Sequence, residues 1–218
     1  MSNVSNSNIP EKTIERLSEY RRSLLSCHKQ GITHIFSHVL AGMHGITAVQ
    51  VRRDLMLIGF SSDTKKGYDV KVLIEFINNI LDSQNVMNIA VIGMGHLGQA
   101  ITKYFNSKGL KLRIVTAFDI DPEKVGTTID EIPCYHMNQF EVVVSSMDIS
   151  IVVISSPTRV APTLVVPIIN AGIKGVLNFT SAPLHFPQGI VSENYDITTI
   201  LEKVAYFVKE SDESNDKN

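Results

Sequence analysis

A glycine-rich segment at residues 93–98 constrains the fold of this 218-residue chain more than any other feature. It follows the apolar run Asn88–Ile92, which is typical of a buried strand, and a helical stretch comes directly after it. Glycines at the spacing of Gly93, Gly95 and Gly98 are typical of the turn that carries a dinucleotide pyrophosphate between a strand and a helix. The segment therefore predicts a βαβ nucleotide-binding unit.

Each glycine has an expected role in that turn. Gly93 allows the tight bend, Gly95 lets the backbone approach a pyrophosphate, and Gly98 permits close packing of the helix on the strand. The helix N-terminus adds N–H donors and a positive dipole. A glycine-rich turn that binds no ligand is the alternative. The expected cofactor contacts in the turn also include the residues between the glycines: Met94, His96 and Leu97.

An acidic residue follows at the distance that a dinucleotide site requires. The next predicted strand, Leu112–Phe118, ends at Asp119, which lies 21 residues after Gly98. A carboxylate there accepts a hydrogen bond from the adenosine ribose and repels a 2′-phosphate. The sequence therefore predicts NAD(H) as the cofactor in preference to NADP(H).

Two further strands complete a mostly parallel α/β sheet. They are predicted at Ile149–Ile154 and Gly175–Phe179, with a helical crossover between them. Ligands bind at the carboxyl ends of such strands. The small polar loops that follow the strands should therefore face the nicotinamide, and the expected contacts are Ser155, Ser156, Pro157 and Thr180.

The first half of the chain has a different pattern, of three short helices. The first begins at Pro10, the second ends near Gly42, and the third begins at Thr47. This order, with a glycine-containing turn before the third helix, predicts a helix-turn-helix. The expected apolar positions of the first two helices are Ile14, Leu17, Leu24, Leu25, Ile35, Phe36, Val39 and Leu40.

The third helix has the side chains of a DNA-reading helix. Thr47 is expected to cap it, with Gln50 answering three residues later in a capping box. At 100° per residue, Gln50 and Arg53 project away from the apolar face, and Arg52 lies on the flank. Outward Gln and Arg side chains suit base-edge contacts in the major groove, although a solvated polar face is the alternative. The apolar face is formed by Val51, Leu55 and Ile58.

A basic loop follows the third helix. Lys65, Lys66 and Gly67 lie in it, which suits the wing of a winged helix that contacts DNA phosphates or a minor groove. A surface turn is the alternative. A further amphipathic helix leads to the polar break at 82–85, which predicts a domain boundary.

These features predict four segments: a disordered N-terminus at 1–8, a winged-helix domain at 9–82, a Rossmann-like domain with a C-terminal helix at 86–209, and a disordered acidic tail at 210–218. Residues 1–85 hold 10 Lys and Arg against 8 Asp and Glu, and the rest holds 10 against 14, which weakly favours a nucleic-acid module in front.

The sequence also argues against several classes of protein. No apolar run is long enough for a membrane span, no signal peptide is apparent, and Cys27 and Cys134 have no metal-ligand spacing. We therefore expect a cytoplasmic protein without metal. No room remains for a substrate domain, so we expect no enzyme. Two alternatives stay open: a small NAD-dependent oxidoreductase, and a nucleotide- or CoA-binding module whose front half mediates protein contacts.

Over residues 9–209 the chain resembles the Rex family of redox-sensing transcriptional repressors. The segments that carry the resemblance are Ile9-Pro10, Ile14–Leu17, Thr47–Asp54, Gly59-Phe60, Lys65–Tyr68, Gly93–Gly98, Ala117–Asp119, Asp121–Gly126 and Ala171–Phe179. The resemblance implies a homodimer that binds a palindromic operator and is released by NADH, while NAD⁺ is compatible with DNA binding.

The resemblance also implies roles for particular residues. The helix at 197–208 would swap into the partner subunit. Tyr104 and Asp196 would respond to the redox state of the nicotinamide, and Arg16 could pair with Asp196 of the partner in one state only. Such a contact would couple two distant sites.

Three positions depart from the family pattern. The wing lacks a second glycine before Tyr68, which bears on operator preference. Ile197 stands where an aromatic residue is common, and Ser155-Ser156-Pro157 replaces Thr-Val-Pro. Both of these changes fall where the nicotinamide is expected.

Overall fold

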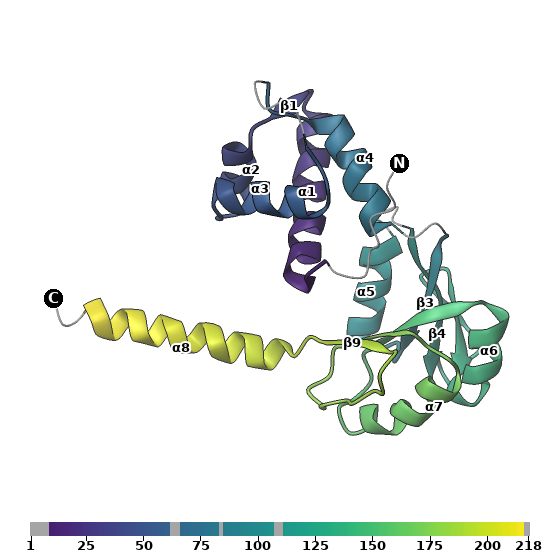
Figure 1. The fold of residues 1–218 in the computed structure, drawn as a ribbon. Helices are drawn as coiled ribbons and strands as arrows, with labels where there is room; N and C mark the ends of the chain where they lie inside the picture. The colour runs from purple at the N-terminus through teal and green to yellow at the C-terminus, as the bar shows by residue number, and fades with distance from the viewer. Residues whose placement is uncertain (1–8, 62–65, 83–84, 107–110, 216–218) are drawn as a thin grey trace. The chain divides into compact units, whose positions relative to one another are not determined.

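The structure is a computed structural model that describes residues 9–61, 66–82, 85–106 and 111–215. The chain divides into two compact units, Met1–Gln84 and Asn85–Asn218 (Figure 1). The predicted disordered N-terminus at 1–8 lies outside the described residues.

The described residues of the first unit form four α-helices and a small antiparallel sheet. Its elements are α1 (Glu11–Lys29), β1 (His34–Ile35), α2 (Ser37–Met43), α3 (Ala48–Leu57), β2 (Tyr68–Asp69) and α4 (Val70–Leu81). Strand β2, which follows α3 in the chain, pairs antiparallel with β1, as in a winged helix. The largest fully buried side chains of this core are Leu17, Tyr20, Leu24, Leu40, Leu55, Ile58, Leu73 and Ile77.

Two expectations for this unit were wrong in detail. Ile35 lies in strand β1 and pairs with Tyr68, instead of opening the second helix. Its β-branched side chain is buried, and its backbone is bonded across the wing. Three of the apolar positions expected in the first two helices, Leu25, Phe36 and Val39, are 42%, 44% and 41% exposed.

The second unit is built on a seven-stranded sheet in the order β5-β6-β4-β3-β7-β8-β9. Neighbouring strands from β6 to β9 run parallel, and among the described strands of this sheet only β5 and β6 pair antiparallel. The strands are β3 (Met87–Ile92), β4 (Leu112–Asp119), β5 (Thr128–Ile129), β6 (Ile132–His136), β7 (Ile149–Ile154), β8 (Gly175–Asn178) and β9 (Val191–Asn194).

Helices cover both faces of this sheet. Side chains of β3 alternate between two cores: Ala90 and Ile92 pack in the core with α6 (Phe140–Ser146) and α7 (Val165–Asn170), and Ile89 and Val91 in the core with α5 (His96–Asn106) (Figure 1). Strand β3 has β4 on one side and β7 on the other. The order of strands therefore reverses at β3, and a crevice forms beyond its carboxyl end.

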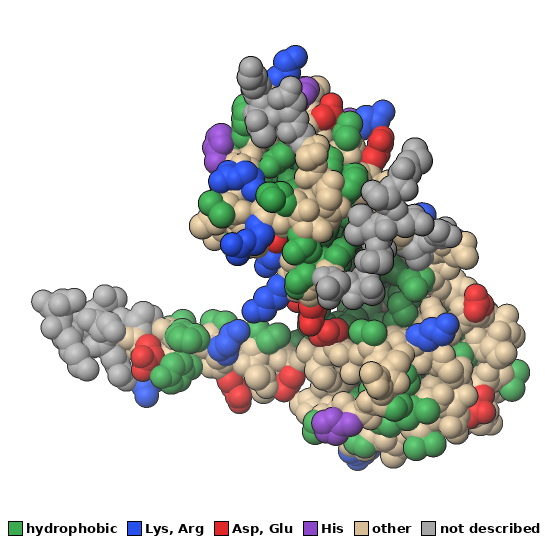
Figure 2. Space-filling view, in the orientation of Figure 1, with side chains coloured by type: hydrophobic (Ala, Val, Ile, Leu, Met, Phe, Trp, Pro, Cys, Tyr) green, Lys and Arg blue, Asp and Glu red, His purple; other side chains and the backbone are tan. Residues whose placement is uncertain are grey.

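The last helix, α8 (Ile197–Asn215), is longer than expected. It continues through 210–215, where a disordered tail was predicted, because neither Gly nor Pro interrupts the sequence after residue 197. Its apolar side chains between Ile197 and Val208 are exposed, and green side chains are visible on this part of the helix (Figure 2). Within the described ranges, no helix is long and apolar enough to cross a lipid bilayer.

Candidate functional site

A cavity with a volume of about 550 Å³ lies at the carboxyl ends of β3, β4 and β7. This volume falls within the range of small-molecule sites. Both polar and apolar side chains line it. The lining includes Gly93, Gly95, His96, Leu97, Asp119, Lys124, Ser155, Ser156, Pro157, Arg159 and Val160. Predicted cofactor residues from both halves of the crevice therefore come together here. Five others do not line this cavity: Met94, whose side chain is buried, Gly98, Tyr104, Thr180 and Asp196.

Close contacts require a glycine at two of the three glycine positions in the turn. Gly93 has φ of +97°, and a Cβ there would lie 2.7 Å from the backbone nitrogen of Ser156. A Cβ on Gly98 would clash with the carbonyl oxygen of Gly93, so α5 packs tightly on the turn. In contrast, a Cβ on Gly95 would have no neighbouring atom within 4 Å. The backbone at Gly95 is thus free for the approach of a phosphate group.

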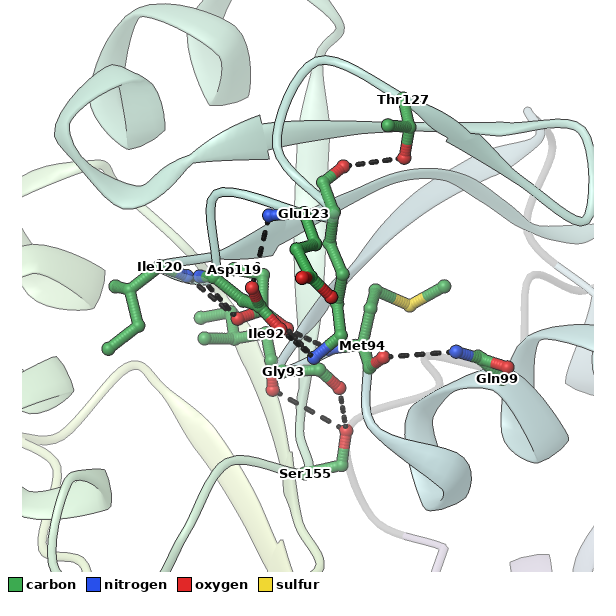
Figure 3. Close-up of polar contacts among 11 residues, drawn as sticks. Ile92, Gly93, Met94, Gln99, Asp119, Ile120, Glu123, Thr127 and Ser155 are labelled. Carbon is green, nitrogen blue, oxygen red and sulfur yellow. Dashed lines mark hydrogen bonds and ion pairs between the residues drawn. The ribbon is translucent and has the colours of Figure 1, made fainter.

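Hydrogen bonds from neighbouring elements hold the turn in place (Figure 3). The Oγ of Ser155 donates to the Gly93 carbonyl at 2.8 Å, and the Nε2 of Gln99 donates to the Met94 carbonyl at 3.2 Å. The Gly93 N–H donates to the Phe118 carbonyl at 2.8 Å. Strands β4 and β7 and helix α5 therefore all fix the turn.

Asp119 is bonded within its own domain. Its Oδ2 accepts from the Met94 N–H at 2.8 Å and lies 3.4 Å from Lys124 Nζ. Its Oδ1 accepts from the N–H groups of Ile120, at 2.8 Å, and Asp121, at 3.0 Å. Burial raises the pKa of Asp119, but the N–H donors outweigh it and hold the pKa below its usual value. The residue is a fixed anion at neutral pH.

A second hollow of about 240 Å³ adjoins this cavity, and both are lined by Leu97, Ser155, Ser156 and Pro157. It is also lined by Thr180 and by Asp196, which precedes α8 and accepts from Thr199 Oγ1 at 2.7 Å. The expected nicotinamide residues are thus in one place, although Tyr104 lines neither hollow and is 58% exposed on α5.

One buried hydroxyl in this region fits a ligand. Ser156 Oγ has no hydrogen-bond partner among the described residues. A buried polar atom is costly unless it is paired, so a cofactor that bonds to it would remove that cost. Thr180 is positioned by a residue that sequence reasoning used only as part of a motif: Asn178 Oδ1 accepts from its N–H at 3.0 Å and from its Oγ1 at 2.8 Å.

The winged-helix unit presents the predicted cationic side chains. Arg52, Arg53 and Lys66 are exposed, and Arg52 Nη1 donates to Ser37 Oγ at 3.1 Å. Thr47 caps α3 by accepting from the Gln50 N–H. Lys65 lies outside the described residues.

The Gln50 side chain does not complete the capping box and does not project freely. Its Nε2 donates to Asp54 Oδ1 at 2.9 Å, one turn further along α3. The helical wheel missed this contact because it places side chains by spacing alone, without their bonding partners. The nearby carboxylate attracts the amide group.

Asp54 is the centre of a buried polar network that sequence reasoning missed. It is 2% exposed and accepts from Arg16 at two positions, each 2.7 Å, and from Tyr20 Oη at 2.8 Å. Burial raises the pKa of Asp54, but its donors Arg16, Tyr20 and Gln50 lower it below the usual value. The pKa of Tyr20 is raised by burial and by donation to Asp54.

This network gives Arg16 a partner within its own domain. Arg16 of α1 is joined to Asp54 of α3. The contact fixes the first helix against the third. The sequence contains both oppositely charged residues, Arg16 and Asp54, but their pairing cannot be inferred until the packing of the two helices is known. The pairing of Arg16 with Asp196 of a second subunit, which the resemblance implies, stays a prediction.

Comparisons with known proteins cover nearly the whole chain. Residues 8–55 match the family model "Putative DNA-binding protein N-terminus", and residues 84–182 match "CoA binding domain". The redox-sensing transcriptional repressors Rex of Leuconostoc citreum (strain KM20) and Anoxybacillus flavithermus (strain DSM 21510 / WK1) are each 34% identical. They cover 92% of this chain, and 93% and 94% of their own lengths.

Solved structures give the same result. RSP, a Rex-family repressor, has been solved in complex with β-NAD⁺ and operator DNA. That structure has a TM-score of 0.88 and 29% identity over 96% of this chain and 97% of its own. RSP in complex with β-NADH has a TM-score of 0.84 and 28% identity over 97% of this chain and 100% of its own.

Proposed function

The chain belongs to the Rex family of redox-sensing transcriptional repressors, and from that premise we propose that it binds operator DNA and is released by NADH. The observation that carries this function is the likeness over nearly the full chain to RSP, which has been solved both with NADH and with NAD⁺ and operator DNA. The cavity at the glycine-rich turn supports it, because its residues suit a dinucleotide. The relatives are repressors, which favours a regulator over a small oxidoreductase.

The test is operator binding followed by fluorescence anisotropy at fixed salt, with NADH, NAD⁺ and CoA titrated separately. The probe is a set of palindromic AT-rich duplexes, with a scrambled duplex as control. Release by NADH at concentrations where NAD⁺ has no effect is the expected result. Release by CoA instead would favour the ligand for which the matching domain family is named.

A DNA-binding repressor acts where the chromosome lies, so we propose that the protein is cytoplasmic.

We propose that α3 reads bases with Arg53. Arg53 is exposed on the helix, and an arginine can bond both acceptors of a guanine edge. Replacing Arg53 with alanine should weaken operator binding by about 1–3 kcal/mol. Arg22→Ala removes an equal charge from the exposed face of α1 and serves as the control. Equal affinities of the Arg53 variant and the wild type would refute this role.

We also propose that the protein is a homodimer held by α8. Ile200, Leu201 and Val204 on this helix are 48%, 62% and 53% exposed, an apolar surface that a monomer would leave in water. On the α5 face of the sheet, an apolar hollow of about 270 Å³ is lined by residues that include Ile151, Leu177 and Val191. A second copy of the chain would cover such surfaces.

Replacing Leu201 with glutamate is expected to convert the dimer into monomers. The substitution removes about 2 kcal/mol of apolar burial from each of two equivalent sites and adds a charge that loses hydration in the interface. Light scattering after size-exclusion chromatography measures the mass, and Lys203→Glu, at an exposed charged position of the same helix, is the control. A Leu201→Glu protein with twice the mass of one chain would contradict the assignment.

A further inference from the structure

The loop after β7 carries a cation that neither the glycine-rich motif nor the acidic residue accounts for. Arg159 lies five residues after the end of β7 and lines the same cavity as Gly93, Gly95 and Asp119. Within the part of the chain that the structure describes, its side chain makes no hydrogen bond or ion pair, and it is exposed. A guanidinium has five donors, and none of those of Arg159 bonds to another of the residues that the structure describes.

The other cation that lines the cavity is already neutralised. Lys124 Nζ lies 3.1 Å from Asp121 Oδ2 and 3.4 Å from Asp119 Oδ2, so it serves two carboxylates. Donation to Asp121 raises the pKa of Lys124 above its usual value. The two carboxylates offset the positive charge of Lys124, so this lysine attracts an incoming phosphate only weakly. Among the described residues of the cavity lining, Arg159 is the cation without a carboxylate partner.

The turn itself offers fewer N–H donors than its sequence suggests. The Met94 N–H donates to Asp119, so it is not free for a phosphate oxygen. The remaining backbone donors come from the start of α5, beside Gly95. A pyrophosphate carries two negative charges near neutral pH, and the partial charge of one helix end neutralises only part of them.

We propose that Arg159 binds the pyrophosphate of the dinucleotide, as the charged partner that the glycine-rich turn lacks. An arginine suits this role because its planar fork bonds two phosphate oxygens at once. The assignment rests on the proposed binding of NADH. Since NADH and NAD⁺ share the same pyrophosphate, Arg159 adds affinity for both and does not distinguish between them.

The test measures binding of four ligands to the full chain by calorimetry: NADH, NAD⁺, ADP and adenosine. Arg159→Ala should weaken NADH, NAD⁺ and ADP by about tenfold each, the size of one charge-assisted hydrogen-bonded contact. Adenosine, which has no phosphate, should bind within about twofold of the wild type. Arg159→Lys should recover part of the loss, because it keeps the charge and loses the paired geometry.

Arg113→Ala is the matched control. Arg113 is an exposed arginine near the start of β4, the end opposite to the cavity, so its removal changes the net charge equally. Affinity of the Arg159→Ala protein equal to that of the control would overturn the proposal. An equal loss for adenosine and ADP would also overturn it, because it would show stacking on the base.

Loss of NADH binding by the wild type and an unchanged affinity of the Arg159→Ala protein have different meanings. A wild-type chain that binds neither NADH nor NAD⁺ would overturn the proposed function, and the assignment of Arg159 with it. A wild-type chain that binds both and an Arg159→Ala chain that binds them equally well would overturn only the role of Arg159. A changed ratio of NADH to NAD⁺ affinity in the variant would place Arg159 at the nicotinamide and likewise contradict the proposal.

Discussion

Replacing Asp54 with alanine is expected to destabilise the winged-helix unit by about 3 kcal/mol or more and to abolish operator binding. The substitution removes the acceptor of Arg16, Tyr20 and Gln50 in one step. Tyr20 is fully buried and would lose its hydrogen bond, whereas Arg16 is 23% exposed and recovers part of its hydration. Helices α1 and α3 would lose the contact that joins them.

Urea denaturation combined with hydrogen exchange of the α1 and α3 amides measures this loss. Glu75→Ala, an exposed carboxylate on α4, is the control, and it should leave stability within about 0.5 kcal/mol of the wild type. NADH binding, which belongs to the second unit, should persist in both variants. Unchanged exchange rates in α1 and α3 of the Asp54→Ala protein would contradict the assignment.

The same carboxylate gives the stability of this unit a pH dependence. The folded-state pKa of Asp54 is lower than that of the unfolded chain, so the ionised residue stabilises the fold at neutral pH. This contribution is complete above the unfolded value of about 4 and is lost as the pH falls through the folded value. The Asp54→Ala variant should therefore lose less stability than the wild type on acidification.

The second large effect is expected at Asp119. Replacing it with alanine should weaken NADH binding by about tenfold to a hundredfold, because the variant loses the acceptor for the ribose and for the Met94 N–H that shapes the turn. It also frees Lys124 from one of its two carboxylates. The affinity for NADPH should therefore fall less than that for NADH, since the anion that repels a 2′-phosphate is gone.

Calorimetric titration of both nucleotides measures the two affinities. Glu123→Ala, an exposed acidic position near Asp119, is the control. Asp119→Asn keeps an acceptor for Met94 without the charge, so it separates the shape of the turn from the repulsion of a phosphate. Equal NADH affinities of the Asp119→Ala protein and the wild type would refute the role of Asp119.

Patterns that depend on neighbouring residues were read correctly from the sequence. The strand before the glycine-rich turn, the end of β4 at Asp119 and the cap of α3 at Thr47 all depend on local spacing, and the structure confirms them. The core of the first unit also follows from apolar periodicity in α3, as the burial of Val51 and Leu55 shows.

What sequence reasoning missed depends on long-range pairing. Strands β5, β6 and β9 are short and polar in part, so they form only because a strand beside them is already in place. The contact of Arg16 with Asp54 joins residues 38 positions apart, and no local spacing predicts it. Arg159, whose role is proposed from its place in the cavity lining, belongs to no spaced motif, so nothing in the sequence marks it.

The bracing of the glycine-rich turn has a consequence for the speed of the response. Asp119 and Ser155 hold the turn through bonds to Met94 and Gly93 that come from the protein itself. A pocket that is preorganised in this way pays little entropy for ordering a loop, so association is not slowed by a conformational search. Uptake of the nucleotide should therefore not wait for the turn to become ordered, so after a rise in the nucleotide pool the site should fill at the rate of simple association.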